Sequence, residues 1–314
     1  MRSILHQRSS KVADYFFVVG AAENELELSS NGNNGNSGTP PSDTPLHEWV
    51  FIDKVIDRYP SSSSSTLKAS RAVPFPEGVH LFCLPAGLRL SSVPLSPTFH
   101  SFVHTSENAS RLLGSCLTFY EPINSMQLLS LRNLVEYALS KEQLADIVEK
   151  QWWVPKCICL ISQWPFVYSF KRVLCQIYLM SFGENSLPLE RYISNFINDV
   201  PAPPVGRVDI TYYLSSSTIT FRCPPMNQPH AWSGLPLTPL FECLSLPNIL
   251  ALFSAVVAER QIIYVSSQYS VLTYCIEAIT SLIYPLKWSH VYIPILPLSL
   301  IGTRLFKDYK CLFG

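Results

Sequence analysis

The first half of the chain alternates short apolar runs with polar, turn-forming segments. Residues 13–20 (ADYFFVVG) are aromatic and β-branched and end in glycine, which predicts a buried strand. Further strands are predicted at 49–52, 79–83, 98–105 and 111–120. The segments 21–45 and 60–73 are rich in Gly, Pro, Asn or Ser and predict loops. Several strands in succession favour an antiparallel sheet.

A helical pattern separates this strand-rich half from the rest of the chain. Asn124 is a favourable N-cap residue, and the helix that it begins is expected to run to about residue 151. Met126, Leu129 and Leu134 recur at a spacing that places them roughly on one side of that helix. The segment is therefore expected to be a helical linker over residues 124–151.

Beyond residue 151 the pattern changes to alternating strands and helices. A strand at 156–162 (KCICLIS) is followed by helices near 165–180 and 187–199, and by a pair of strands at 207–213 and 218–223. Helices are then predicted at 240–244, 249–260 and 269–284, and strands at 261–265 and 291–293. Alternation of this kind favours a parallel sheet with right-handed crossovers. The expected fold class is therefore α/β, with an antiparallel α+β lobe followed by a doubly wound, mostly parallel α/β lobe.

Composition narrows the possible functions. The chain has 314 residues, 23 Lys+Arg and 23 Asp+Glu, so its formal net charge is zero. A neutral chain lacks the basic footprint that captures nucleic acid, so no nucleic-acid partner is expected. Only 15% of the residues are charged whereas 47% are hydrophobic. A soluble domain has roughly 25% charged residues on average, so this chain is expected to carry an apolar, partner-binding face.

The apolar runs do not predict a transmembrane span. Such a span needs about 20 apolar residues in succession. The run at 244–258 ends at Glu259, and the run at 269–286 contains Glu277 and Pro285. The first 11 residues are polar and lack the apolar core of a secretion signal. We therefore expect a cytoplasmic protein that can associate peripherally with vesicle membranes.

Motifs for covalent chemistry do not occur in the sequence. It contains no phosphate-binding loop, no nucleophile elbow, no H-E-x-x-H and no C-x-x-C pair. His100 and His104 share a predicted strand face, but core packing is favoured over a metal pair. Cys157 and Cys159 alternate with Ile158, so their thiols are expected to face the same side of a sheet as small buried side chains. We expect no catalytic residue, cofactor or metal.

Several of these segments together resemble a known family. ADYFFVVG, residues 74–90 (PFPEGVHLFCLPAGLRL), FHSFVHT and LTFYEP resemble the upstream segment of DENN domains. KCICLIS and the segments 187–207, 252–267 and 283–297 resemble their central segment. These segments together cover most of residues 12–300, and they follow one another in the same order as in DENN domains. It implies a longin-like first lobe and guanine-nucleotide exchange activity on small GTPases of the Rab family.

Six residues are candidate contacts for a partner, although the family has no sharp contact motif. Ligands of open α/β sheets tend to lie beyond the carboxyl ends of strands, which favours Ser266, Ser267 and Gln268 after the predicted strand 261–265. Arg207 follows a proline-rich bend. Glu259 and Arg260 lie at a helix-to-strand corner, where a solvent-facing pair is favoured over a partner contact.

The resemblance also suggests a division of the chain. The predicted parts are a polar N-terminus (1–11), an upstream DENN lobe (12–123), the helical linker (124–151), a central DENN lobe (152–300) and a divergent end (301–314). The downstream DENN segment is expected to be absent, which would leave the second lobe incomplete and impair exchange. The alternative function is a non-catalytic DENN or longin scaffold that binds a small GTPase or a trafficking adaptor. A membrane-embedded protein is a weaker third hypothesis.

Overall fold

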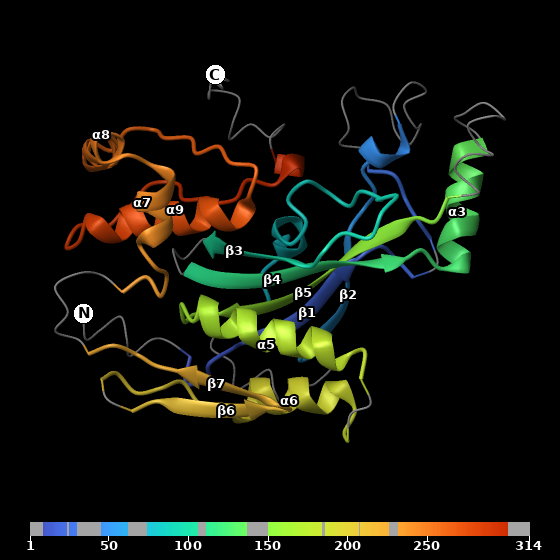
Figure 1. The fold of residues 1–314 in the computed structure, drawn as a ribbon, viewed down its shortest axis with the longest axis horizontal. Coiled ribbons are helices and arrows are strands. Elements are labelled where there is room, and N and C mark those ends of the chain that lie inside the picture. Colours follow the sequence, from blue (N-terminus) through green and yellow to red (C-terminus); the bar gives the residue numbers. More distant parts are fainter. Residues whose placement is uncertain are drawn as a thin grey trace.

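The structure is a computed structural model that describes residues 9–23, 25–29, 45–61, 74–105, 111–136, 150–183, 186–206, 208–225 and 232–300. The statements below refer to these residues. Figure 1 shows strands in a central layer with helices on several sides, and the chain colours follow the sequence.

Five strands form the central sheet, and all of its pairs are antiparallel. Their order is β2-β1-β5-β4-β3. A separate antiparallel hairpin is formed by β6 and β7. The bounds of the strands are β1 Tyr15–Gly20, β2 Lys54–Tyr59, β3 Thr98–Thr105, β4 Arg111–Pro122, β5 Trp153–Ser162, β6 Ile210–Leu214 and β7 Ser217–Phe221.

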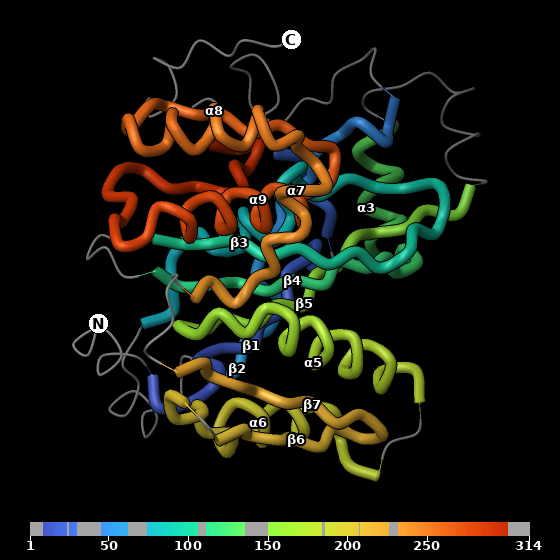
Figure 2. The backbone as a smooth tube through the Cα atoms, turned by 60° about the vertical axis from the view of Figure 1, so that its left-hand side comes forward, coloured from blue at the N-terminus to red at the C-terminus, as the bar shows by residue number. Residues whose placement is uncertain are grey.

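The helices cover both faces and one end of this sheet. The α-helices are α3 Ser125–Glu136, α5 Val167–Met180, α6 Leu189–Asp199, α7 Thr238–Cys243, α8 Leu246–Val257 and α9 Tyr269–Leu282. Three short 3-10 helices are η1 Leu46–Glu48, η2 Val79–Phe82 and η3 Leu298–Leu300. In Figure 2, α5 and α6 lie on one side of the strands and α7, α8 and α9 lie on the other side, next to β3.

The period-2 alternation of strand β5 explains why the sheet has two cores. Cys157, Cys159 and Ile161 point into one apolar cluster, which the loops around η1 and η2 and helix α3 cover. Ile158 and Leu160 point to the other face and pack with α5, α6 and the β6-β7 hairpin. Because both faces of β5 are buried, its sequence is an almost continuous apolar run.

Most of the predicted elements are confirmed. Strands occur at 15–20, 98–105, 111–122 and 153–162, and the two strands predicted at 207–213 and 218–223 form the β6-β7 hairpin. The helices predicted after residues 124, 165 and 186 are α3, α5 and α6. The second half of the predicted helix 124–151 lies outside the described residues, which end at 136 and resume at 150.

Two predictions for the first half of the chain are wrong, and one strand was missed. Residues 79–82 form the 3-10 helix η2 instead of a strand, because Gly78 turns the chain at φ +67 immediately before it. Residues 49–52 make only isolated bridges, in which Phe51 pairs with Leu28 and with Leu88. The strand β2 at 54–59 was not predicted, because its sequence KVIDRY carries charges that suit a half-exposed edge strand.

The mixed α/β fold class is confirmed, but the expected doubly wound parallel sheet does not occur among the described residues. Strand β5, expected to begin the second lobe, pairs with β1 and β4 of the first sheet. The segments 261–265 and 291–293 have no ladder of hydrogen bonds to another strand. Extended apolar segments become strands only when partner strands lie beside them. Residues 261–265 pack against the helices of a separate apolar cluster instead, and Tyr292 packs with Val103 on β3 and Ile276 on α9.

Helices α7, α8 and α9 form a third, smaller core. Leu240 on α7, Ile249 and Val256 on α8, and Ile279 on α9 are buried together. Helix α9 joins this core to the sheet, since the hydroxyl of Thr273 donates to the backbone carbonyl of Ser101 on β3. No helix in the described ranges has both the length and the apolar character needed to cross a membrane.

Candidate partner-binding surface

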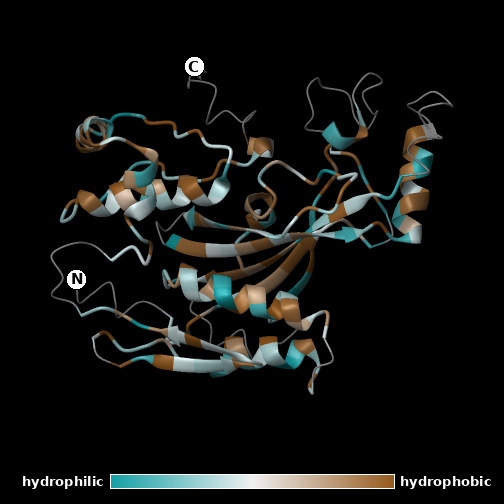
Figure 3. Cartoon of the chain, in the orientation of Figure 1, coloured by the Kyte–Doolittle hydropathy of each residue, from teal (hydrophilic) through white to brown (hydrophobic). Residues whose placement is uncertain are grey.

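Large apolar side chains are exposed along the last third of the described chain. On α8 the exposed large apolar residues are Leu246, Leu250 and Val257, whose spacing of four and seven places them on one side of the helix. We call these three residues the α8 stripe. Figure 3 shows the hydrophobic colour along much of α8 and α9. The α8 stripe is unusual for a surface helix, because Ile249 and Val256 already supply its buried side.

The segment that follows α8 exposes a second set of apolar side chains. Residues 261–265 alternate, so that Ile262 and Tyr264 pack against the third core while Ile263 and Val265 face outward. We call Ile263 and Val265 the extended strip; they are 56% and 84% exposed. Burial raises the pKa of Tyr264 to about 12, so its inward phenol stays neutral.

The structure places five of the six predicted contact residues at the two ends of the extended strip. Glu259 and Arg260 precede it and are exposed, while Ser266, Ser267 and Gln268 follow it at the start of α9. Ser266 and Gln268 are brought together, since the Gln268 N–H donates to Ser266 Oγ at 3.1 Å. Arg207 lies outside the described residues.

The end of α8 has a specific backbone geometry. The N–H of Arg260 donates to the carbonyl of Ala255, and the N–H of Glu259 donates to that of Val256, both at 3.0 Å. These bonds form a Schellman C-cap, in which the left-handed position is normally glycine. Here Glu259 occupies it at φ +53. Its carboxylate lies 3.1 Å from Nε2 of His290.

Polar contacts hold the segment that follows α9 against the sheet. Tyr292 donates its hydroxyl to the carboxylate of Glu277 on α9. Burial raises the pKa of Glu277, and the Tyr292 hydroxyl and nearby Arg111 partly oppose this. Arg111 at the start of β4 lies over the Tyr292 ring at 4.6 Å and donates to the carbonyl of Trp288. The segment that carries His290 is therefore held close to the sheet.

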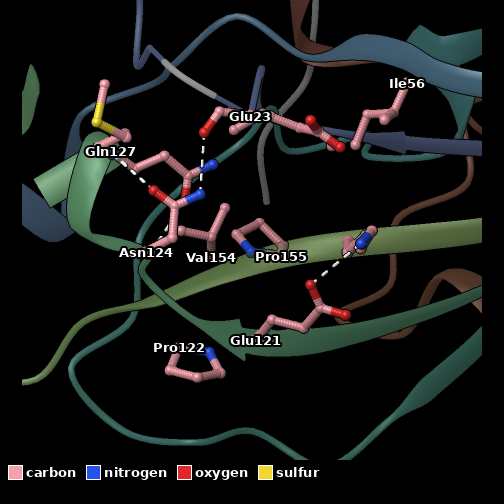
Figure 4. Close-up of a pocket in the computed structure, with 12 residues that line it drawn as sticks. Glu23, Ile56, Glu121, Pro122, Asn124, Gln127, Val154 and Pro155 are labelled. Carbon is pink, nitrogen blue, oxygen red and sulfur yellow. Dashed lines mark hydrogen bonds and ion pairs between the residues drawn. The ribbon is translucent and has the colours of Figure 1, made fainter. Parts of the chain in front are cut away.

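A shallow cavity lies near the start of α3, at the opposite end of the sheet (Figure 4). Its polar groups already bond to one another. Asn124 Oδ1 accepts the N–H of Gln127 at 2.8 Å, and Gln127 Oε1 accepts the N–H of Asn124 at 3.4 Å, which is a capping box. Asn124 Nδ2 also donates to the carbonyl of Glu23. These contacts confirm that Asn124 caps α3. The polar side chains that line the cavity therefore already have structural roles at the start of this helix.

His100 on β3 and the cysteines of β5 are core residues, and His104 on β3 is half-buried. His100 is buried and its Nε2 lies 3.0 Å from the carbonyl of Phe82. His104 packs edge-on against the Phe82 ring. Burial lowers the pKa of both imidazoles. Cys157 and Cys159 are fully buried on one side of the sheet, as predicted.

These features define a mixed α/β protein whose most distinctive exposed feature is an apolar surface at the end of α8. Comparison with known proteins gives the family. The uDENN domain model matches residues 53–119, and the DENN (AEX-3) domain model matches residues 153–304. The chain belongs to the DENN domain family.

A curated relative supports this assignment. The chain is 29% identical over 260 residues to the DENN domain and WD repeat-containing protein SCD1 of Arabidopsis thaliana. The match covers 79% of this chain and 20% of the relative. The chain therefore spans about a fifth of the length of that relative.

Proposed function

We propose that this chain binds a small GTPase of the Rab family and accelerates the release of its GDP in vesicle trafficking. The observation that carries the proposal is the succession of two DENN segments along one chain, at 53–119 and 153–304. DENN domain proteins are generally exchange factors for Rab GTPases. The name of the relative adds only that its DENN domain is joined to WD repeats.

The residues that the chain exposes are compatible with nucleotide exchange on a GTPase. Nucleotide exchange makes and breaks no covalent bond in the protein, so it needs no general acid or base. It requires that the exchange factor binds the nucleotide-free GTPase more tightly than the GDP-bound form. A neutral, apolar surface can supply such binding energy through contact area.

Within this proposal the extended strip and its ends form the contact region. Ile263 and Val265 would supply apolar area, and Glu259 and Arg260 at one end and Ser266 and Gln268 at the other would supply polar contacts at the rim. This arrangement of an apolar centre and a polar rim is typical of protein interfaces. We extend the same proposal to Ser267 and Arg207.

The test is a release assay with a panel of purified Rab proteins that carry a fluorescent GDP analogue. We expect the purified chain to accelerate release from at least one of them, and to bind that Rab more tightly without nucleotide than with GDP. A catalytically inactive scaffold would instead bind a Rab irrespective of its nucleotide, or would prefer the GTP-bound form. Binding that favours the GDP form would contradict the proposal.

A further inference from the structure

Four cysteine thiols meet in the core on the η2 side of the sheet. Cys83, Cys116, Cys157 and Cys159 are each 0% exposed and carry free thiols. Cys116 on β4 and Cys159 on β5 are direct partners in the antiparallel register. Cys157 lies two residues before Cys159 and therefore faces the same side. Cys83 comes from the turn that follows η2.

The sulfur atoms are separated by distances that suit a single metal ion. Cys116 Sγ lies 3.2 Å from Cys159 Sγ and 3.7 Å from Cys83 Sγ. The sulfurs of Cys83, Cys116 and Cys157 all lie within 4.8 Å of one another. In a tetrahedral zinc site with Zn–S bonds of about 2.3 Å, the sulfurs are about 3.8 Å apart. Three of the sulfurs therefore already form a compact group, and Cys159, whose sulfur lies next to that of Cys116, would have to move closer to the other two to complete a four-sulfur site.

Apart from one another, these thiols have long, weak hydrogen bonds to backbone carbonyls. Cys83 Sγ lies 3.6 Å from the carbonyl of Val79, and the two β5 thiols lie 3.7 and 3.8 Å from backbone carbonyls. Metal binding would replace these weak contacts with bonds to thiolate, the form of cysteine that binds metals.

We propose that Cys83, Cys116, Cys157 and Cys159 bind one thiophilic metal ion, of the class to which Zn²⁺ and Cu⁺ belong. Each thiol that becomes a ligand releases its proton to solvent, so no oxidant or reductant is needed. The site is closed on all sides, which fits a structural role that stabilises the sheet. This differs from the sequence-based expectation of no metal, because strand register rather than a C-x-x-C motif assembles the ligands.

The direct test is the metal content of the whole chain. The protein is produced in medium supplemented with Zn²⁺ or with copper, purified with a thiol reductant, and analysed by mass spectrometry for elements. We expect about one ion per chain in one of the two preparations, and loss of at least about nine-tenths of it in Cys116→Ala. The matched control is Cys223→Ala, since Cys223 is also buried but packs on the other face of the sheet.

A second readout also tests the wild type itself, so that the proposal can be overturned even if the Cys116→Ala variant does not fold. The whole chain is unfolded under reducing conditions and refolded with Co²⁺, which gives a sulfur-to-cobalt absorption band when thiolates bind it. We expect the band in the wild type and in Cys223→Ala, and not in Cys116→Ala that circular dichroism shows to be folded. A folded wild type without metal and without the band would overturn the proposal. So would a band that persists in folded Cys116→Ala, because the metal would then lie elsewhere, for example at neighbouring Cys243 and Cys275.

Discussion

The carboxylate of Glu259 lies 3.1 Å from Nε2 of His290, so the end of α8 contacts the segment that precedes Tyr292. The contact depends on a residue in an unfavourable backbone conformation, since Glu259 has φ +53 where helices usually end in glycine. Both side chains of the pair are exposed, and an exposed ion pair contributes only about 0–1 kcal/mol. Stability alone therefore gives little reason for a glutamate at this position.

Replacement of Glu259 by glycine should give a more stable protein than replacement by alanine. The left-handed conformation costs a residue with a side chain roughly 1–2 kcal/mol. We expect Glu259→Gly to raise the free energy of unfolding by about 1 kcal/mol relative to Glu259→Ala, which removes the carboxylate but keeps the strain. Urea denaturation measures both variants. Equal stability of the two would show that φ at this position carries no cost.

The extended strip should matter for binding and not for folding. Ile263 and Val265 are exposed, so Ile263→Asp with Val265→Asp should leave the thermal midpoint nearly unchanged. If the strip contacts a Rab GTPase, GDP release should fall by at least about tenfold, which is ~1.4 kcal/mol.

The matched control for the strip is the pair Val93→Asp and Leu95→Asp, since those residues are also large, apolar and exposed but lie before β3. The control should keep full activity. An equal loss of GDP release in both double variants would place the contact outside the strip.

Glu277 should make stability depend on pH. Because its folded pKa is raised, the folded state holds a proton that the unfolded state has already lost. Its contribution to stability is therefore fully present below the unfolded pKa of 4.5 and is lost as pH rises through the folded pKa.

Glu277→Gln tests this dependence, because the amide oxygen can still accept the Tyr292 hydroxyl. Thermal unfolding from pH 4 to pH 8 should show a smaller fall in stability with rising pH for the variant than for the wild type. A fall of the same size in both proteins would assign the dependence to other groups.

Gly114 on β4 should not tolerate a side chain. It lies opposite Phe102 on β3, and a Cβ at Gly114 would lie 2.1 Å from the Phe102 ring. We expect Gly114→Ala to lower the free energy of unfolding by about 1–3 kcal/mol or more, through overpacking. Gly183→Ala is the control, because nothing lies within 4 Å of the added carbon. Chemical denaturation should separate the two variants clearly.

The capping box at α3 gives a further prediction. Asn124→Ala should cost about 0.5–2 kcal/mol of stability, because the N–H of Gln127 loses its acceptor. Asn124→Ser retains a capping oxygen but loses the bond to the Glu23 carbonyl, so it should cost less than the alanine variant. A serine variant as unstable as the alanine variant would assign the effect to the Glu23 contact instead of the cap.

The sequence by itself determined those helices and strands that a local pattern of residues specifies. The buried run of β5 and the apolar spacing of α5 predicted those elements close to their observed bounds, and the cap residue Asn124 predicted where α3 begins, because propensity and periodicity act within a few residues. The resemblance to the DENN family likewise depended on segments that can be compared one by one. The candidate residues 259–260 and 266–268 could be named from sequence, but not the exposed apolar residues between them.

Tertiary structure decided which segments find partners. Residues 261–265 have a strand-like sequence, yet they remain without a ladder because helices of the third core lie beside them. The four core thiols come from residues 83 to 159, and only the register of β4 with β5 brings Cys116 to Cys159. Pairing between distant segments depends on the free energy of the whole fold, which local sequence does not encode.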